Sequence, residues 1–319
     1  MSIAFDPTHW ALILGGSSGF GLATAQKLAR HGMSVAVVHR DRRGSMTTIE
    51  PEFEKIRKGG VGFFTLNLDA LSAEGRKTAL DALAEKMGAA GRVRLLMHSI
   101  AYGNLKPLVA PRAPEGRADE VARARSRLAE QLGVAEGALE AALRKVVEAG
   151  GSDPLLALLD PPVSDSEAVL EDEDFARTVY SMGTSLSTWT QDVLARGMFA
   201  ADARVIGMTS EGNEVAWRGY AAVAAAKVAM ESLSRAIAVE LAPYGVRSNI
   251  VQAGVTDTPA LRLIPGSDRM KAEARARNPF GRLTTPSDVA DVICLLCTDE
   301  ARWVNGALIR VDGGEHIAG

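Results

Sequence analysis

The chain has 319 residues, of which 47% are hydrophobic and 24% charged, and its formal net charge is -3 with a sequence pI of about 6.0. A chain of this length can bury a large α/β core, and its slight negative charge argues against a nucleic-acid partner. No apolar run approaches the roughly 20 residues that span a bilayer, and no basic-then-apolar leader precedes the first expected strand. We therefore expect a cytoplasmic protein with a small-molecule substrate and no membrane role.

Short apolar runs alternate along the chain with amphipathic segments of helical length. The apolar runs cover residues 11–14, 34–39, 62–66, 94–97, 205–208, 248–252 and 308–312. The first helix is expected over 19–31 and the last near 287–297. This alternation predicts an α/β fold with a doubly wound parallel sheet of the Rossmann type, in which the whole chain, 1–319, forms a single domain.

The alternation is interrupted between the fourth and fifth expected strands, where over a hundred residues replace a single crossover. We expect a helical insertion over 104–174, and the acidic run at 171–174 is expected to open the next long helix. Two short amphipathic helices are predicted inside it from apolar residues at helical spacing: Val121, Leu128, Leu132, Leu139, Leu143 and Val146. Because the insertion leaves the strand that carries His98, a substrate lid and a subunit contact are both consistent with it.

Residues 14–21 read Leu-Gly-Gly-Ser-Ser-Gly-Phe-Gly and join the first strand to the first helix. Glycines permit a tight turn there, let backbone N–H groups approach a pyrophosphate, and let the helix pack closely on the sheet. The N-terminus of the helix faces the anion. A glycine-rich loop alone is weak evidence, but this strand, loop and helix in succession predict a dinucleotide site.

The loop resembles that of the short-chain dehydrogenase/reductase family, which reads Thr-Gly-x3-Gly-x-Gly. Gly15, Gly19 and Gly21 match, and Leu14 stands in place of Thr. The resemblance covers nearly the whole chain apart from the insertion, since Asn67 and Leu68 are similar to an adenine-contacting pair and residues 278–282 and 311–314 to C-terminal markers. It implies an oxidoreductase that uses a nicotinamide cofactor and forms a homotetramer or homodimer through helices around 180–200 and 220–240.

The choice between NADPH and NADH depends on the end of the second strand. A carboxylate there hydrogen-bonds the ribose hydroxyls of NAD, whereas a basic group accepts the 2′-phosphate of NADP. Arg40 stands where the family usually keeps the phosphate-binding residue, and a guanidinium suits a phosphate. We expect NADPH, with NADH as the less favoured alternative because Asp41 is adjacent and a one-residue shift would reverse the preference.

The residue four before Lys227 is Val223, which has no proton to donate, so the Tyr-x3-Lys pair of most family members is absent. Tyr220 precedes Lys227 by seven residues, a spacing that puts both side chains on one helical face, two turns apart. This Tyr-x6-Lys pattern resembles the enoyl-acyl-carrier-protein reductases of the family. Three further features are also similar to theirs: the run His98-Ser99-Ile100-Ala101-Tyr102, Ala253-Gly254 in place of Pro-Gly, and Thr258.

The chemistry of conjugate reduction explains the displaced donor. Hydride is delivered to C3 and charge builds on the thioester oxygen, farther along the substrate than a ketone oxygen would be. Tyr220 is expected to hydrogen-bond that oxygen and Lys227 to hold the nicotinamide ribose. Ser210 stands where these reductases usually have a second Tyr or Phe and where ketoreductases keep their catalytic Ser, so Tyr102 or Tyr180 is a candidate for the missing aromatic contact with substrate.

Each assignment has a plain structural alternative. Ser210 can be interpreted instead as a strand-end hydroxyl that caps a loop, Lys227 as a surface lysine, and Tyr220 as a packing aromatic. The residues expected to contact the cofactor, mostly by family resemblance, are Gly15, Ser17, Ser18, Gly19, Phe20, Gly21, Arg40, Asn67, Leu68, Ser99, Ile100, Ala101, Lys227, Gly254, Val255 and Thr258.

Three functions fit the sequence. The first is NADPH-dependent reduction of a 2-enoyl thioester on an acyl carrier protein or CoA; the others are a ketoreductase or alcohol dehydrogenase of secondary metabolism, and a non-catalytic cofactor-binding protein. Basic residues in the insertion would suit an acidic carrier, although a solvated helix face explains them equally well: Arg112, Arg117, Arg123, Arg125 and Arg127. No metal site is expected, because Cys294 and Cys297 lie in an apolar run without partner ligands and are predicted to be core residues.

Overall fold

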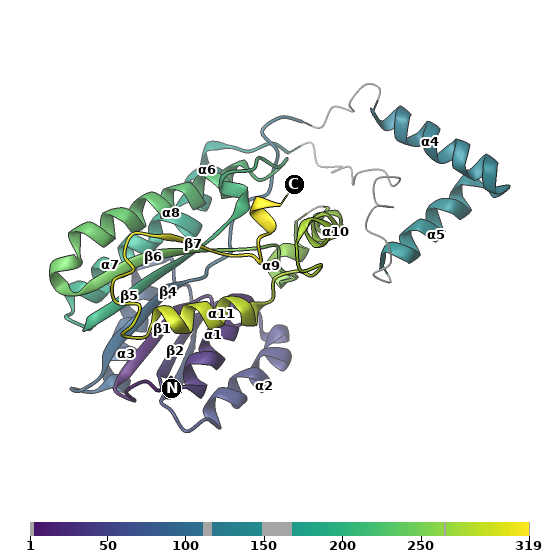
Figure 1. The fold of residues 1–319 in the computed structure, drawn as a ribbon. Helices are drawn as coiled ribbons and strands as arrows, with labels where there is room; N and C mark the ends of the chain where they lie inside the picture. Colours follow the sequence, from purple (N-terminus) through teal and green to yellow (C-terminus); the bar gives the residue numbers. More distant parts are fainter. Residues whose placement is uncertain (1–2, 111–116, 149–167, 265, 319) are drawn as a thin grey trace.

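The computed structural model describes residues 3–110, 117–148, 168–264 and 266–318. Its seven-stranded sheet has the order β3-β2-β1-β4-β5-β6-β7, and every neighbouring pair is parallel. The predicted doubly wound sheet is thereby confirmed (Figure 1). The strands are β1 (His9–Leu14), β2 (Ser34–His39), β3 (Phe63–Asn67), β4 (Arg92–His98), β5 (Phe199–Ser210), β6 (Val246–Ala253) and β7 (Leu308–Val311).

Helices cover both faces of this sheet and extend beyond one of its ends. Those that follow the first three strands and complete the crossovers between later strands are α1 (Gly19–Arg30), α2 (Met46–Arg57), α3 (Ala73–Met87), α7 (Ser185–Ala195), α8 (Ala221–Glu240) and α11 (Pro286–Leu296). The remaining α-helices are α4 (Arg117–Leu132), α5 (Glu136–Glu148), α6 (Asp172–Val179), α9 (Pro259–Arg262) and α10 (Ser267–Arg277).

The central strands are buried on both faces because each contributes alternate side chains to two separate cores, whereas the edge strands β3 and β7 are only partly buried. In β1, Ala11 and Ile13 belong to the core beneath α1, α2 and α11, whereas Leu12 and Leu14 belong to the core beneath α3, α7 and α8. β1 and β2 are accordingly almost continuously apolar, without polar alternation. The buried Cys294 and Cys297 lie in the first of these cores, as predicted.

The strand order reverses between β1 and β4, where the chain crosses from one half of the sheet to the other. Leu14 at the end of β1 pairs with His98 at the end of β4. In open α/β sheets, ligands bind outside the carboxyl ends of the strands at such a reversal. The segments that follow these two strands, the glycine-rich loop and the segment from Ser99, are therefore the ones positioned to form a site.

Among its described residues, the predicted insertion forms the helices α4 and α5, where the spacing of its apolar residues predicted helices. Ala129, Leu139 and Leu143 are buried and belong to one apolar cluster with Ala272 of α10. Figure 1 shows α4 and α5 outside the body, beyond the end of the sheet where α9 and α10 lie. Residues 149–167 of the predicted insertion and the basic residue Arg112 fall outside the described residues.

The insertion is closed at its base by contacts between its two ends. The Asp174 carboxylate accepts hydrogen bonds from Asn104 Nδ2 at 2.8 Å and from Lys106 Nζ at 2.7 Å. The Leu170 N–H donates to the Pro107 carbonyl at 2.9 Å. Asp174 also belongs to the capping box at the start of α6, so one carboxylate both starts this helix and joins the ends of the insertion.

The long helix expected after residue 174 is interrupted by a π-helical turn at Tyr180–Thr184 between α6 and α7. Gly183 in this turn lies against α8, and a Cβ there would be 2.6 Å from the Ala226 carbonyl oxygen. The wide turn thus allows a close approach of two backbones. In the described part of the chain, no helix is both long and apolar enough to span a membrane.

Candidate active site

The glycine-rich loop between β1 and α1 folds as tightly as its sequence predicts. Gly15 has φ +81°, and a Cβ on it would lie 2.6 Å from the Ser99 carbonyl oxygen. A Cβ on Gly21 would lie 2.3 Å from the Gly15 carbonyl oxygen. Ser18 precedes α1 without forming a side-chain capping bond, and the first turn of α1 carries no acidic residue. The helix N-terminus, together with this loop, therefore fits a phosphate anion.

A cavity of about 210 Å³ adjoins the loop. The segments after β4, β5 and β6 form its walls, together with residues of α8, α9 and α10. Thr258 lines the cavity and lies close to Gly19 of the loop, since a Cβ on Gly19 would lie 3.5 Å from the Thr258 methyl group. The cavity is lined by eight of the predicted cofactor residues: Phe20, Ser99, Ile100, Ala101, Lys227, Gly254, Val255 and Thr258.

The segment after β6 requires a glycine at Gly254. A Cβ there would lie 2.4 Å from Thr284 Oγ1 and 2.9 Å from a carboxylate oxygen of Glu315. The next residue, Val255, donates its N–H to Glu315 Oε2 at 3.3 Å. Burial raises the pKa of Glu315, while the Val255 N–H and Arg277 oppose that rise. The absence of a side chain at Gly254 thus lets this segment lie against the C-terminal part of the chain.

Arg40 is an exposed cation at the end of β2. Its guanidinium lies over the Tyr102 ring, 4.8 Å from the ring centroid, and 3.4 Å from the Asp69 carboxylate. The neighbouring Asp41 carboxylate is bonded to His39 Nδ1 at 2.8 Å. Asn67 exchanges two hydrogen bonds with the Asp41 backbone, each 3.0 Å long. The Asp41 carboxylate and the Asn67 amide are thus already bonded within the protein, whereas the Arg40 side chain is exposed and accessible to a ligand.

Leu68 and Asn67 both connect β3 to the end of β2. The Leu68 N–H donates to the His39 carbonyl at 2.8 Å, which continues the strand pairing by one residue. The Asn67 side chain is occupied by the backbone of Asp41 rather than directed outward as a free amide. The predicted adenine-contacting pair therefore supports the loop that carries Arg40.

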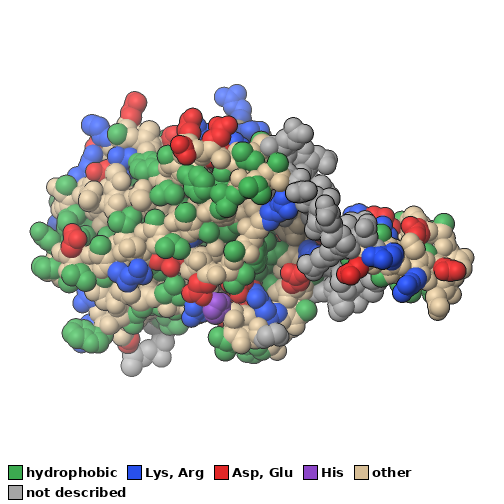
Figure 2. All heavy atoms as spheres, turned by 90° about the horizontal axis from the view of Figure 1, so that it is seen from above, with side chains coloured by type: hydrophobic (Ala, Val, Ile, Leu, Met, Phe, Trp, Pro, Cys, Tyr) green, Lys and Arg blue, Asp and Glu red, His purple; other side chains and the backbone are tan. Residues whose placement is uncertain are grey.

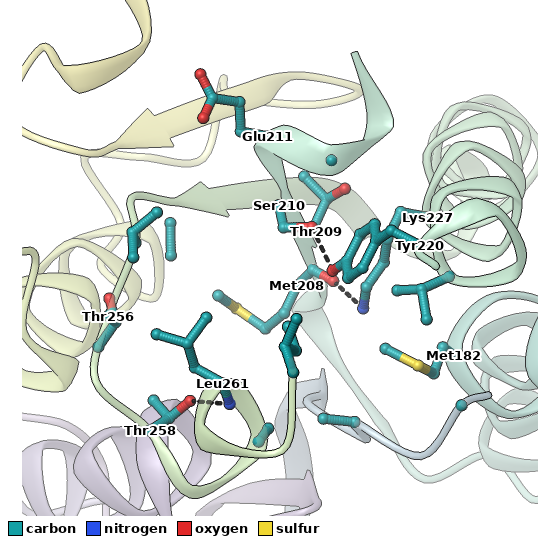
Figure 3. A pocket seen from close by; sticks show the side chains of 18 of the residues that line it. Met182, Met208, Thr209, Ser210, Glu211, Tyr220, Lys227, Thr256, Thr258 and Leu261 are labelled. Carbon is teal, nitrogen blue, oxygen red and sulfur yellow. Dashed lines mark hydrogen bonds between the residues drawn. The ribbon is translucent and has the colours of Figure 1, made fainter. Parts of the chain in front are cut away.

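Tyr220 and Lys227 line the cavity together, as does Ser210. The Tyr220 hydroxyl lies 3.1 Å from Ser210 Oγ, and Figure 3 shows Tyr220 and Lys227 pointing into the cavity from the same side. Burial raises the pKa of Tyr220, and the bond to Ser210 opposes this rise. The phenol is therefore a protonated donor at neutral pH.

Tyr220 differs in one respect from the prediction, because it does not lie within the helix that carries Lys227. The helix α8 begins at Ala221, and Tyr220 is its N-cap residue, with φ −109° and ψ 1°. Its ring packs on Gly212, where a Cβ would lie only 2.3 Å from Tyr220 Cε1. The turn before α8, rather than helical spacing, thus orients the phenol.

Lys227 is buried, with only 6% of its surface exposed, and its Nζ donates to the Met208 carbonyl at 2.8 Å. Burial lowers the pKa of Lys227 to about 8, and the Glu231 carboxylate opposes this change. His98 is fully buried nearby, with Nε2 2.8 Å from Ser185 Oγ. Burial and the charge of Lys227 lower the pKa of His98 to about 3, so its imidazole is neutral.

Tyr102 and Tyr180, the candidates for a second aromatic substrate contact, lie elsewhere. Tyr102 is 45% exposed and packs against Arg40, at the end of β2. The Tyr180 hydroxyl donates to the Leu71 carbonyl at 3.0 Å and accepts from Arg76 Nη1 at 2.9 Å. Neither is among the described residues that line the cavity. The expectation that one of them assists Tyr220 is therefore not met.

Several cavity residues were not singled out from the sequence. Trp217 is the aromatic residue that lines the cavity beside Tyr220, with its ring centroid 6.3 Å from that of Tyr220. Trp217 lies three residues before Tyr220 in the sequence, and this proximity could have identified it as a candidate. The other unpredicted lining residues are mostly apolar, among them Leu105, Met182, Met208, Leu261, Leu263, Ile264 and Met270.

Comparisons with known proteins agree with this geometry. A family model described as enoyl-(acyl carrier protein) reductase matches residues 135–316, and one described as short chain dehydrogenase matches residues 9–110. Cis-4-hydroxycyclohexanecarboxylate dehydrogenase of Sinomonas cyclohexanicum is 31% identical over 54% of this chain and 68% of its own. The NADH-dependent enoyl-acyl-carrier-protein reductase of Aquifex aeolicus strain VF5 is 30% identical over 46% of this chain and 56% of its own.

The crystal structure of the Aquifex aeolicus enoyl-acyl-carrier-protein reductase (NADH) aligns over 98% of this chain and 97% of its own, with a TM-score of 0.68 and 23% sequence identity. The curated sequence relatives above align over about half to two thirds of their length. The family matches, the parallel sheet and the glycine-rich loop lead to one conclusion. The chain belongs to the short-chain dehydrogenase/reductase family and is an NAD(P)H-dependent oxidoreductase.

Proposed function

We propose that this protein reduces a 2-enoyl thioester, carried on an acyl carrier protein or CoA, with NADPH. The observation that carries the proposal is the position of the proton donor. Val223, four residues before Lys227, lines the cavity without a proton to give, while the Tyr220 hydroxyl faces the same cavity from before the start of α8. A donor displaced in this way suits an oxygen that lies farther from the carbon accepting hydride.

Each polar residue has a distinct role in this proposal. Bound NADPH would supply the hydride. Tyr220, protonated because burial raises its pKa, would donate a hydrogen bond to the thioester oxygen as negative charge develops there. Ser210 would orient the phenol through their 3.1 Å contact, and Lys227 would hold the nicotinamide ribose and add positive charge.

The lining of the cavity supports an acyl substrate. Met182, Met208 and Met270 line it, and flexible thioethers adapt well to aliphatic chains. Leu261 and Leu263 belong to the segment around α9, with Leu263 77% exposed. An apolar wall of this kind favours a hydrocarbon chain over a polar polyol substrate.

The preference for NADPH rests on Arg40 and on the state of its neighbour. Asp41 would have to be free to hydrogen-bond ribose hydroxyls, but its carboxylate is already bonded to His39 at 2.8 Å. Arg40 has a 3.4 Å contact with the Asp69 carboxylate and keeps donors for a 2′-phosphate. The Aquifex relative is named for NADH, so the preference is proposed for this chain alone.

Reduction of a ketone is the second candidate function. The Ser210 and Tyr220 hydroxyls lie 3.1 Å apart, close enough for both to bind one carbonyl oxygen. Similarity to a hydroxycyclohexanecarboxylate dehydrogenase is consistent with this alternative. A non-catalytic role is disfavoured, because Tyr220 and Lys227 both line the cavity beside the cofactor loop.

Oxidation of NADPH and NADH, followed by absorbance, separates these functions. The purified protein is given crotonyl-CoA and, in parallel, acetoacetyl-CoA at matched concentrations. The proposal expects turnover with the enoyl thioester and NADPH, at a kcat/KM at least about tenfold above that for the keto thioester. The reverse order of substrates would establish the ketone reductase instead.

We further propose that the insertion shapes the acyl end of the cavity. Leu105, at its start, lines the cavity, and a Cβ on Gly219 would lie 2.9 Å from the Leu105 carbonyl oxygen, next to Tyr220. On its other side, Met270 of α10 lines the cavity while Ala272 of the same helix belongs to the insertion's apolar cluster. The insertion therefore adjoins the site through two separate segments.

A deletion tests this role. Because the Leu170 N–H bonds to the Pro107 carbonyl, a short Gly-Ser bridge can replace residues 109–168 without breaking the base. Loss of discrimination between crotonyl-CoA and dodecenoyl-CoA, with unchanged NADPH affinity, is the expected result. Intact discrimination with a smaller assembly would indicate a subunit contact.

Assembly as a homotetramer or homodimer is also proposed, through the helices around 180–200 and 220–240. Val228 and Val239 of α8 are 48% and 76% exposed, which supports α8 as a contact surface. An acyl carrier protein remains a proposed partner. On the face seen in Figure 2, the α4–α5 lobe carries both acidic and basic side chains, so this view gives no strong support for that partner. Light scattering of the purified protein measures the assembly.

A further inference from the structure

Glu231 lies on α8 one turn beyond Lys227, and the functions discussed so far do not involve it. Its Oε1 accepts a hydrogen bond from Thr209 Oγ1 at 2.5 Å and another from Asn213 Nδ2 at 2.6 Å. Thr209 is the residue before Ser210 at the end of β5, and Asn213 is the last residue of the following 3-10 turn. One carboxylate oxygen therefore binds both ends of the segment that carries Ser210 and Gly212.

We infer that Glu231 is a positioning residue for the active site, which holds the Ser210 turn on α8 and keeps Lys227 charged. This inference rests on the roles proposed above for Ser210 and Lys227. Without the two bonds, the turn of Ser210, Glu211 and Gly212 would be joined to α8 through the ring of Tyr220 on Gly212 and the Ser210–Tyr220 bond. Movement of this turn would move the partner of the Tyr220 hydroxyl directly.

The same carboxylate acts on Lys227 through charge. Within the described parts of the chain, the charged or titratable groups that act on Lys227 are Glu231 on α8 and His98 on β4, and Tyr220 lines the same cavity. His98 is neutral at pH 7 because its pKa is about 3, and Tyr220 is protonated, so Glu231 is the anion that stabilises the ammonium. Burial acts in the opposite direction and lowers the pKa of Lys227 to about 8.

Two substitutions of Glu231 separate positioning from charge. Glu231→Gln keeps an acceptor oxygen for Thr209 and Asn213 but removes the negative charge. Glu231→Ala removes both. A third variant, Asn213→Ala, removes one of the two donors at a residue that does not line the cavity. Glu240→Gln, at the exposed end of the same helix, is the matched control.

The experiment measures NADPH affinity by fluorescence across the range from neutral to alkaline pH, and kcat with crotonyl-CoA. In the wild type, affinity should weaken as pH rises through the pKa of Lys227, about 8. In Glu231→Gln, this midpoint should move down by roughly one pH unit, since an opposite charge nearby is removed, while kcat at about pH 6.5 stays close to wild type. Glu231→Ala and Asn213→Ala should also lose kcat at that pH, by about tenfold or more for Glu231→Ala.

If the pH midpoint of NADPH affinity is the same in Glu231→Gln as in the wild type, the inference that Glu231 keeps Lys227 charged is wrong. If Glu231→Ala and Asn213→Ala both keep full kcat, the inference that Glu231 positions the Ser210 turn is wrong. If Glu231→Ala fails to fold, Asn213→Ala and Glu231→Gln still decide both. If the wild type reduces no enoyl thioester, the proposed function fails, but the NADPH titrations continue to test Glu231. Glu240→Gln should match the wild type throughout.

Discussion

Buried cations lie at both ends of the sheet, but they differ in how many of their N–H donors have partners. Toward the amino ends of the strands, Arg94 and Arg204 are 4% and 1% exposed. Arg94 donates to the Cys297 carbonyl at 2.9 Å and Arg204 to the Leu296 carbonyl at 2.8 Å, and both pair with Asp202. At the carboxyl ends, Lys227 has the Met208 carbonyl as its hydrogen-bond acceptor within the described residues.

This difference indicates a structural role for the arginines and an arrangement for ligand binding at Lys227. The two arginines are satisfied by the last carbonyls of α11 and by a shared carboxylate, so they fix a helix to the sheet. Lys227 lines a cavity and uses one of its three N–H donors for the Met208 carbonyl, so the others are available to a ligand. Burial lowers the pKa of Lys227 to about 8. A buried cation with its donors filled is structural, whereas one with donors to spare is arranged for a ligand.

The largest effect is expected at the structural end. Arg204→Met removes one of the guanidinium partners of Asp202 and the donor to the Leu296 and Thr298 carbonyls at the α11 terminus. It should therefore lower the free energy of unfolding by about 3 to 5 kcal/mol. Urea denaturation measures this loss, and Arg302→Met, at an exposed site, is the control. A loss below about 1 kcal/mol would show that the arginine is dispensable and that the contrast between the two ends is wrong.

Low pH provides a second test of the ion pairs that Arg94 and Arg204 form with Asp202. Burial alone would raise the pKa of Asp202, but the bond from Arg204 and the nearby guanidinium charges lower it overall. A lowered folded-state pKa contributes stability that is present above the unfolded value and is lost as pH falls through the folded one. The difference in unfolding free energy between wild type and Arg204→Met should therefore narrow below about pH 4.

The next largest effect is expected at the functional end. In the proposed reduction, Tyr220→Phe would remove a hydrogen bond that strengthens as charge develops, so kcat should fall about 10²-fold or more with NADPH affinity unchanged. Steady-state kinetics with crotonyl-CoA measures it. Tyr180→Phe is the matched control, because that hydroxyl is occupied by Leu71 and Arg76. Full activity in Tyr220→Phe would transfer the donor role to Ser210 or another group.

Much of this fold could be predicted, because its signals are local. Apolar runs set the strands, and glycines at positions such as Gly15 reflect a turn with positive φ. Tyr220 and Lys227 were predicted from a resemblance to the Tyr-x6-Lys pattern of the enoyl reductases, and both line the cavity. The spacing argument nevertheless assigned Tyr220 to the helix, whereas the chain turns at Gly219, with φ +76°, and the helix begins one residue after Tyr220.

The rest of the site depends on contacts between distant segments, which periodicity does not encode. Glu231 contacts Thr209, 22 residues away in the sequence, and Arg40 contacts Tyr102 because β2 and β4 both pair with β1. An aromatic residue was expected beside Tyr220, and the one that lies there in the cavity is Trp217 rather than Tyr102 or Tyr180. Sequence spacing could indicate that an aromatic residue is needed, but not which aromatic residue of the chain the fold places in the cavity.

A smaller effect is expected at the cofactor's far end. Arg40→Ala should raise the KM for NADPH about ten- to a hundredfold and change that for NADH little, since one charge-assisted phosphate contact is lost. Arg42→Ala, exposed in the same segment, is the control. Initial rates with both nucleotides measure the ratio. An unchanged preference would show that Arg40, like the arginines at the amino ends, is structural.

The smallest effect concerns stability at Lys227, and its sign follows from the pKa. Lys227 has a folded-state pKa of about 8 against an ordinary 10.5, so the folded protein binds the proton less readily than the unfolded chain. Its charge therefore destabilises the fold below about pH 8, and this penalty fades as pH rises from there toward the ordinary value of 10.5. Lys227→Met removes the charge but leaves the Met208 carbonyl without its donor, so a net gain of about 1 kcal/mol is expected at neutral pH. Thermal unfolding should show a higher Tm for Lys227→Met at neutral pH, a smaller difference at about pH 9.5, and loss of NADPH binding at both. A variant that is less stable than wild type at neutral pH, or a difference independent of pH, would place Lys227 with Arg204 among the structural cations.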